Sequence, residues 1–153
     1  PWTRNVELGV LDTTRELGIA LVAFSPVGRG ALAGALGDPL VLEDKDLRGG
    51  HPRFSDENWP RNMELIRQFN ALAAEAGVTP AQLSLAWVLS RGEHLHAIPG
   101  TTSAAHMADN FAAAKVSVSG EVLEKAGRIV NQQTVSGHRY PEVMRGTIDT
   151  EDF

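Results

Sequence analysis

The sequence predicts an α/β fold in which parallel strands alternate with amphipathic helices. An uninterrupted apolar run at residues 19–24 predicts the first strand, and "HLHAI", which ends at Pro99-Gly100, predicts the second. Helical periodicity begins at Arg61, between these strands, and continues after the second strand. Strands that alternate with helices indicate parallel βα units, which occur both in barrels and in doubly wound sheets.

A short helix is predicted before the first strand. Valines and leucines at positions 6, 8, 10, 11 and 17 lie among polar residues, and Gly18 ends the pattern. The first strand is apolar throughout, which suits a parallel sheet that is covered on both faces. Residues 28–58 then lack a period and predict a long loop, and loops of this length are usually functional or disordered.

Two helices are predicted between the strands. The first starts at Arg61 and ends at Gly77, with an apolar face formed by Met63, Ile66, Phe69, Leu72 and Ala76. The second starts at Thr79, where Pro80 at the first helical position and Gln82 three residues after the cap form a capping box. Its predicted buried residues are Leu83, Ala86 and Trp87.

Two further helices follow the second strand. Ser103 is the expected cap of a helix whose apolar stripe is Met107, Phe111 and Ala114. The last predicted helix begins at Ser119. Its side chains that are expected to face inward are Val122, Ala126, Ile129 and Val130. Two strands alone leave apolar faces and unpaired edges, so we expect this chain to be one part of a larger domain.

The composition excludes several classes of partner. The 153 residues are 42% hydrophobic and 22% charged, and the net charge of −5 includes no basic block that could follow a nucleic acid. The absence of cysteine excludes disulfides and thiolate chemistry, which fits a cytoplasmic location. No apolar run approaches the roughly 20 residues that a membrane span needs. We therefore expect neither a nucleic acid nor a membrane as partner.

The loop after the first strand contains "GRGALAG", with glycines at 28, 30 and 34. This spacing is one residue longer than the G-x-G-x-x-G turn of Rossmann domains, so the glycines favour either a tight backbone path or a phosphate-binding turn. The position of the loop favours a phosphate-binding turn. It leaves the carboxyl end of a parallel strand, where Ser25 and Arg29 offer a hydroxyl and a forked cation to phosphate.

The loop after the second strand presents a second candidate anion site. Gly100, Thr101, Thr102 and Ser103 stand directly before a predicted helix, whose free N–H groups and dipole favour an anion. Ordinary capping by Ser103, with the hydroxyls in water, is the alternative. Barrels often build a phosphate site from the loops after their seventh and eighth strands, which favours the functional interpretation.

Other polar residues carry weaker hypotheses. His94 and His96 would share one strand face, but no third ligand has suitable spacing, so no metal site is predicted. His51 and His138 lie in loops without recognisable partners. Tyr140, beside Arg139, is expected to have a surface or packing role.

Three segments together resemble the aldo-keto reductases. In order, "RELGIALVAFSPVGRGALAG", "DLRGGHPRFSDENWPRN" and "TPAQLSLAWVLSRGEHLHAIPGTTSAAHMADNFAA" are similar to the family's seventh strand, long following loop, paired helices, eighth strand and last helix. The resemblance runs to about Val130. It implies the C-terminal part only of a (β/α)8 TIM barrel, strands 7 and 8 with flanking helices, at residues 1–133, followed by a C-terminal tail at residues 134–153.

The resemblance also implies a cofactor, NADP(H), bound without a Rossmann domain. Phe24 matches an aromatic ring that stacks on the nicotinamide, and the loop along the pyrophosphate matches Ser25, Pro26, Val27, Gly28 and Arg29. Residues 100–103 match the loop at the 2′-phosphate, where His106 replaces a common arginine, and Asp109 and Asn110 match the pair at the adenine. Because Ser103 and His106 replace cations that attract a 2′-phosphate, NAD(H) is not excluded.

The family's activity, reduction of aldehydes and ketones, depends on residues that this chain lacks. Its catalytic Asp, Tyr, Lys and His lie in the first half of the barrel, and Tyr140 does not match that motif, so no catalytic residue is predicted here. The expected partners are the missing N-terminal half and a small carbonyl substrate, and the isolated chain is expected to be inactive. Two alternatives remain: a non-catalytic nucleotide-binding or interaction subunit on the same fold, and a barrel that binds a phosphorylated substrate.

Overall fold

The computed structural model describes residues 1–146. Helices and strands follow the expected alternation, with 3₁₀ turns at Asn5–Glu7, Gly28–Ala33, Leu47–Gly50, Pro52–Phe54 and Ala113–Lys115. The longer elements are α1 (Val10–Glu16), β1 (Leu21–Phe24), α2 (Trp59–Glu75), α3 (Pro80–Leu89), β2 (Leu95–Ile98), α4 (Ala104–Ala112), α5 (Gly120–Ile129) and α6 (Glu142–Arg145).

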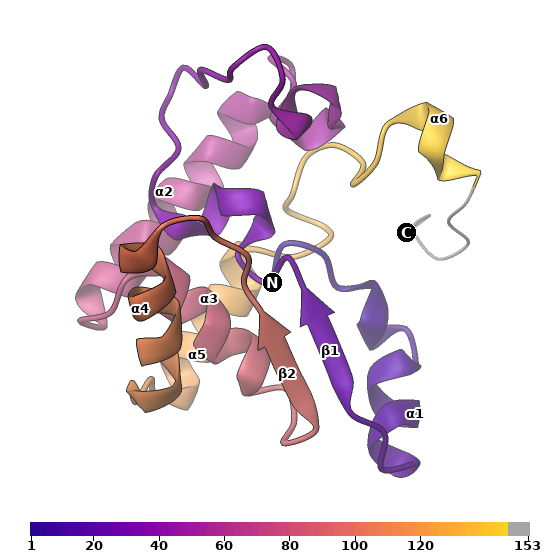
Figure 1. Ribbon diagram of the computed structural model, residues 1–153, viewed down its shortest axis with the longest axis vertical. Helices are drawn as coiled ribbons and strands as arrows, with labels where there is room; N and C mark the ends of the chain where they lie inside the picture. The colour runs from indigo at the N-terminus through magenta and orange to yellow at the C-terminus, as the bar shows by residue number, and fades with distance from the viewer. Residues whose placement is uncertain (147–153) are drawn as a thin grey trace.

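The two strands form a parallel pair, as predicted. Leu21 lies opposite Leu95, and Phe24 lies opposite Ile98, so the strands end at the same level. Both arrows in Figure 1 point toward the end of the molecule where the tail with α6 lies. Because α2 and α3 make the crossover between the strands, the loops that follow β1 and β2 leave the same edge of the sheet.

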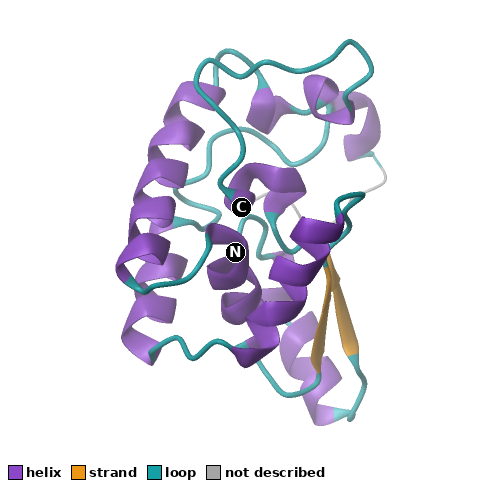
Figure 2. Cartoon of the chain, turned by 60° about the vertical axis from the view of Figure 1, so that its left-hand side comes forward, coloured by secondary structure: helices purple, strands orange, loops and turns teal. Residues whose placement is uncertain are grey.

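One face of this sheet is covered and the other is open. Leu95 is buried, and Leu21, Ala23 and Ala97 pack against the hydrophobic core on the same face. On the opposite face Val22, Phe24 and Ile98 are 53–54% exposed. The strands thus lie at one margin of the helical layer (Figure 2). Within residues 1–146 the expected cover is missing from most of this second face, where the tail residue Arg139 contacts the Phe24 ring.

The core forms where the predicted apolar faces of α2, α3 and α5 meet. The side chains of Ile66, Phe69 and Leu83 are almost completely buried, as are Ala126 and Val130 at the end of α5. The capping box at the start of α3 is confirmed. Thr79 Oγ1 accepts a hydrogen bond from the Gln82 amide (3.1 Å), and the Thr79 amide donates to Gln82 Oε1 (3.2 Å).

Several predicted boundaries are wrong for local reasons. The helix expected at residues 5–17 is divided into a 3₁₀ turn and α1, because Gly9 between them adopts φ +121°. α2 begins at Trp59 rather than Arg61, with Pro60 in its first turn. The helix α6 was not predicted, since its single turn is too short to show a period.

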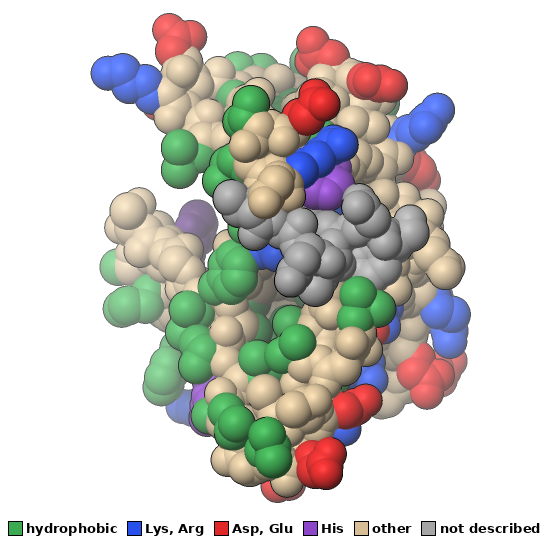
Figure 3. All heavy atoms as spheres, turned by 90° about the vertical axis from the view of Figure 1, so that its right-hand side faces the viewer, with side chains coloured by type: hydrophobic (Ala, Val, Ile, Leu, Met, Phe, Trp, Pro, Cys, Tyr) green, Lys and Arg blue, Asp and Glu red, His purple; other side chains and the backbone are tan. Residues whose placement is uncertain are grey.

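The stripe expected to bury α4 faces outward. Met107 is 62% exposed and Phe111 is 75% exposed. Other exposed apolar side chains belong to the segment before β1, and hydrophobic side chains gather on the face of the molecule at that side (Figure 3): Val6, Leu8, Val10, Leu17 and Ile19. None of the helices in residues 1–146 has the length and apolar character of a membrane span.

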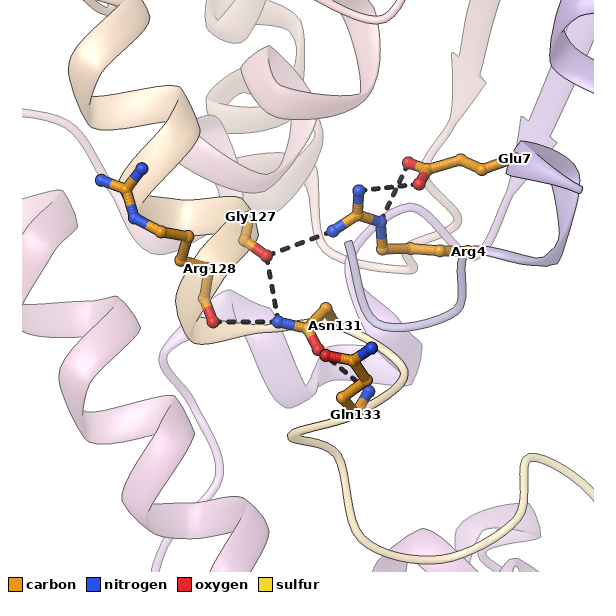
Figure 4. Close-up of polar contacts among 6 residues, drawn as sticks. All are labelled: Arg4, Glu7, Gly127, Arg128, Asn131 and Gln133. Carbon is orange, nitrogen blue, oxygen red and sulfur yellow. Dashed lines mark hydrogen bonds and ion pairs between the residues drawn. The ribbon is translucent and has the colours of Figure 1, made fainter. Parts of the chain in front are cut away.

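The start of the chain is tied to the end of α5 (Figure 4). Arg4 donates to both carboxylate oxygens of Glu7 (2.9 and 2.7 Å) and to the carbonyl of Gly127 (3.2 Å). The same carbonyl accepts from Asn131 Nδ2 (3.3 Å), which also donates to the carbonyl of Arg128 (2.9 Å). These contacts hold the segment around Arg4 against the end of α5.

The C-terminal tail is docked as irregular chain before α6. Asn62 of α2 is fully buried, and its Nδ2 donates to the carbonyls of Arg53 (2.9 Å) and Ser136 (2.8 Å). Its Oδ1 accepts from the Ser136 amide (2.8 Å), while Arg53 Nε donates to the carbonyl of Gly137 (3.1 Å). The remainder of the predicted tail, residues 147–153, lies outside the described residues.

We predict that Asn62→Ala destabilises the protein and releases the tail. The substitution leaves one backbone amide and two carbonyls, all partly buried, without their partner, so the free energy of unfolding should fall by about 2–3 kcal/mol. Urea unfolding of the larger domain of which this chain is expected to be part measures this loss, and faster trypsin cleavage after Arg139 and Arg145 reports the release. Gln68→Ala on the exposed side of α2 is the control, and equal losses in the two variants would contradict the assigned role of Asn62.

Candidate functional site

The loop after β1 carries unusual backbone conformations at two predicted site residues. Ser25 has φ +49° and Arg29 has φ +55°, and in residues 1–146 they are the non-glycine residues with positive φ. Side chains with a Cβ rarely adopt this region, and such strain persists mainly where the surroundings impose it, often at binding sites. The strain therefore marks the same two residues that the sequence analysis favoured.

A buried serine and a glycine hold this loop in place. The Ser84 hydroxyl, fully buried in α3, donates to the carbonyl of Pro26 (2.7 Å). Gly28 has φ +60°, and a Cβ there would lie 3.2 Å from the Trp2 ring. Sequence reasoning missed Ser84. Its only signal is one hydroxyl among the apolar residues of "LSLAW" in α3.

A cavity of about 270 Å³ opens beside this loop. Among its lining residues are the predicted Phe24, Ser25, Pro26, Gly28 and Arg29, whereas Val27 is not. Trp2, Phe54 and Trp87 contribute apolar walls. The described charged residues in the lining are one carboxylate, Glu7, and five arginines: Arg4, Arg29, Arg53, Arg91 and Arg139. The cavity therefore has a positive charge that favours anions.

The loop after β2 lies at the same sheet edge but outside this cavity. The capping role of Ser103 is confirmed, because its Oγ accepts from the His106 amide (3.3 Å), and Thr101 Oγ1 accepts from the Ser103 amide (3.1 Å). Gly100, Thr101, Thr102 and His106 are exposed. Within the described chain these residues form an exposed surface at the N-terminus of α4, so the loops after β1 and β2 do not line one common pocket.

The predicted pair Asp109 and Asn110 is divided between two surroundings. Both carboxylate oxygens of Asp109 accept hydrogen bonds from the start of α3, one from Thr79 Oγ1 (2.8 Å) and one from Gln82 Nε2 (2.8 Å). Asn110 instead lines an apolar hollow between α3, β2 and α4, together with Leu85, Leu89, Ala97, Pro99, Met107, Phe111 and Ala114. Asp109 thus ties α4 to the capping box of α3, a role that sequence reasoning did not assign.

The tail reaches the site through two aromatic contacts. Arg139 Cζ lies 4.7 Å from the centroid of the Phe24 ring and 4.9 Å from that of Tyr140. Arg29 Cζ lies 5.4 Å from the Tyr140 centroid, so Tyr140 packs beside both guanidinium groups, in agreement with its expected packing role. The site residues that sequence reasoning missed here are Arg139 and Arg53, whose long-range contacts leave no local pattern.

Two titratable side chains near the loop after β1, Asp46 and His51, have pKa values lowered by their surroundings. The side-chain and backbone hydrogen bonds from Arg48 lower the pKa of Asp46 to about 2, and Arg48 Nη1 also donates to the carbonyl of Arg29 (3.4 Å). Burial lowers the pKa of His51, and the charge of Arg29 lowers it further against the opposing carbonyl of Leu47. The His51 ring packs 6.1 Å from Tyr140. His51 thus has partners that its sequence position did not reveal.

The remaining histidines do not form a ligand set. A ring nitrogen of His94 lies 3.2 Å from Thr14 Oγ1, and Nδ1 of His138 contacts the backbone of Tyr140. In the part of the chain that the structure describes, no three histidine, cysteine or carboxylate side chains are arranged to hold a metal ion.

The fold defines an α/β protein built from parallel βα units with its candidate site at the carboxyl ends of the strands. Residues 1–130 match the model of the Aldo/keto reductase family. The chain therefore belongs to the aldo/keto reductase family.

Two curated relatives agree with this assignment. Aldo-keto reductase yakc [NADP(+)] of Schizosaccharomyces pombe is 37% identical over 135 residues, which are 88% of this chain and 40% of the relative. Aldo-keto reductase str7 of Strobilurus tenacellus is 30% identical over 156 residues, 100% of this chain and 46% of the relative. The chain thus spans less than half the length of either relative.

Solved structures share the fold over a similar portion. The glycerol dehydrogenase AKR11B4 of Gluconobacter oxydans superposes with a TM-score of 0.75 at 21% identity, covering 82% of this chain and 38% of that protein. The thermostable aldo-keto reductase Tm1743, solved with the inhibitor epalrestat, gives a TM-score of 0.55 at 22% identity, covering 81% of this chain and 35% of that one.

We predict that Ser84→Ala loosens the loop after β1. The substitution leaves the buried carbonyl of Pro26 without its donor, so the free energy of unfolding should fall by about 1–3 kcal/mol. Thermal unfolding of the larger domain of which this chain is expected to be part measures the loss. Ser90→Ala, at the exposed end of α3, removes a comparable hydroxyl that bonds only within its own helix, and it should be close to neutral. If Ser84→Ala were also neutral, Ser84 would not support the loop.

Proposed function

We propose that this chain is the C-terminal part of a (β/α)8 barrel, with β1 as its seventh strand and β2 as its eighth. The complete barrel is a reductase of aldehydes or ketones. Family membership and the partial coverage of longer relatives support this proposal. The observation that carries it is the strained loop at Ser25 and Arg29, which lies at the sheet edge where barrels bind their ligands.

The residues of the two loops fit a nicotinamide dinucleotide. The half-exposed Phe24 ring offers a face for the nicotinamide, and the loop from Ser25 to Arg29 offers a hydroxyl and a guanidinium to the pyrophosphate. Residues 100–103 and the N-terminus of α4 provide amides and hydroxyls for the ribose phosphate. When bound, the cofactor supplies the hydride. We propose NADP(H) in the first place, since a relative's name includes NADP(+).

We propose that Asp109 affects cofactor binding by positioning α4. Its two hydrogen bonds to Thr79 and Gln82 fix α4 against α3, and α4 carries Ser103 and His106 at its start. A carboxylate that accepts two such bonds orients the loop before α4 without needing to contact the adenine itself. Asn110, in the neighbouring hollow, remains our proposed adenine contact.

We predict that Arg29→Gln weakens NADPH binding by the complete barrel. The loss of a charge-assisted hydrogen bond to phosphate should raise the dissociation constant about 10-fold or more, measured by titration of NADPH fluorescence. Arg145→Gln removes the same charge from the exposed α6 and is the control. Equal dissociation constants for the wild type and Arg29→Gln would contradict the proposal.

We further predict that the 153-residue chain alone is inactive and either associates or unfolds without cooperativity. Its sheet exposes Val22, Phe24 and Ile98, and two strands cannot close a barrel. Light scattering, urea unfolding and an NADPH-coupled assay with aldehydes provide the measurements. A monomer that unfolds cooperatively and reduces aldehydes would contradict the assignment of catalysis to the rest of the barrel.

A further inference from the structure

His51 lies close to the loop after β1, although it belongs to the long loop that leads to α2. It joins two 3₁₀ turns, and hydrogen bonds hold its backbone on both sides. Its amide donates to the carbonyl of Arg48 (2.9 Å), and its carbonyl accepts from the Phe54 amide (2.9 Å). The turn before His51 also contacts the loop after β1, because Arg48 Nη1 donates to the carbonyl of Arg29 (3.4 Å). The backbone of His51 is therefore held near the segment proposed to bind the pyrophosphate.

One ring nitrogen of His51 has a hydrogen-bond partner and the other has none among residues 1–146. Nδ1 lies 2.6 Å from the carbonyl oxygen of Leu47. Because a carbonyl only accepts hydrogen bonds, Nδ1 carries a proton, and the neutral ring has its lone pair on Nε2. A second proton can be added at Nε2 without loss of the hydrogen bond to Leu47. That proton converts Nε2 from an acceptor into a donor on a positively charged ring.

Arg29 and Tyr140 are the ionisable side chains nearest in effect to this ring. The Tyr140 ring packs beside both residues, with its centroid 6.1 Å from that of His51 and 5.4 Å from Arg29 Cζ. Burial lowers the pKa of His51, the Leu47 carbonyl opposes this change, and the charge of Arg29 lowers the pKa further. The neutral ring is therefore favoured before any ligand binds.

The other ionisable side chains on the neighbouring segments have partners of their own. Asp46 and Arg48 form an ion pair on the preceding turn. Arg53, on the following turn, donates to backbone carbonyls. In the tail, His138 contacts the backbone of Tyr140, and Arg139 lies over the Phe24 and Tyr140 rings. Apart from the paired Asp46, these described groups provide no carboxylate that would favour a charged imidazole.

A pyrophosphate bound at Arg29 would reverse this balance. Its negative charges would lie beside the arginine that disfavours the protonated ring, and a nearby opposite charge favours the charged form of a histidine. The protonated ring would in turn attract the phosphates. The same change would therefore strengthen both protonation and cofactor binding.

We propose that His51 is a further residue of the dinucleotide site and takes up a proton at Nε2 when the phosphates of the cofactor bind. This inference rests on the proposed function. The proton comes from the solvent, and no bond of the cofactor changes. Because binding and protonation are reciprocal, the affinity for NADPH should rise as the pH falls through the range where histidine titrates, about 6.5.

Dissociation constants of NADPH from the complete reductase, measured by fluorescence titration at several pH values, test this proposal. His51→Asn is the matched variant, since its amide can replace Nδ1 as the donor to Leu47 but takes up no proton. Between about pH 8 and pH 6 the wild-type constant should fall on the order of 3-fold more than that of the variant. The comparison also removes the titration of the 2′-phosphate of NADPH, which occurs at about pH 6 with both proteins.

Two further measurements separate proton uptake from other roles of His51. His94→Gln removes a histidine that precedes β2, at the opposite end of the sheet from the proposed phosphate site, and should keep the wild-type pH dependence. In the wild type, the NMR signal of the His51 imidazole should titrate at a higher pH with NADPH than without it. This second measurement does not depend on the folding of any variant.

Several results would overturn the inference. The same pH dependence in the wild type and His51→Asn would do so while leaving the cofactor site intact. A loss of affinity in His51→Asn that is equal at every pH would assign His51 to the shape of the loop instead. An imidazole signal that titrates at the same pH with and without NADPH would also contradict proton uptake. If NADPH binds to neither protein at any pH, the proposed function fails, and this inference fails with it.

Discussion

The parallel register between β1 and β2 determines where every candidate residue of this chain lies. Phe24 and Ile98 are paired at the last rung, so the loops that follow them leave the sheet side by side. A parallel pair requires a crossover, and α2 and α3 provide it while forming most of the core. A shift of one residue would exchange the side chains of β1 that face the core for those that face outward.

The core supports the strained loop through a few long-range polar contacts. Ser84 bonds to Pro26 across 58 positions, and Asn62 bonds to Ser136 across 74 positions. Each is a fully buried polar side chain on a helix that otherwise buries apolar residues. These two polar side chains thus hold a loop and a tail in defined places, which is what a binding site needs.

Local patterns account for what the sequence could predict. The capping box at Thr79 and Gln82, the cap at Ser103 and the apolar strands depend on neighbours within a few residues, and the structure contains all of them. The family and the parallel pairing follow from the same local segments. The φ angles of Ser25 and Arg29, by contrast, lie in a loop that contacts distant residues, through the Ser84–Pro26 hydrogen bond and the approach of Gly28 to Trp2, and these contacts leave no local pattern. Likewise, the spacing of apolar residues along the sequence does not reveal that Asp109 accepts hydrogen bonds from the start of α3, or that Arg139 contacts the Phe24 ring.

The most direct measurement of the central claim is a crystal structure of the complete barrel with bound NADPH. We expect the nicotinamide against Phe24, the pyrophosphate within hydrogen-bond distance of Ser25 or Arg29, and the ribose phosphate at residues 100–103. A cofactor bound away from both loops, or at the amino ends of β1 and β2, would contradict the assignment of this sheet edge as the cofactor site.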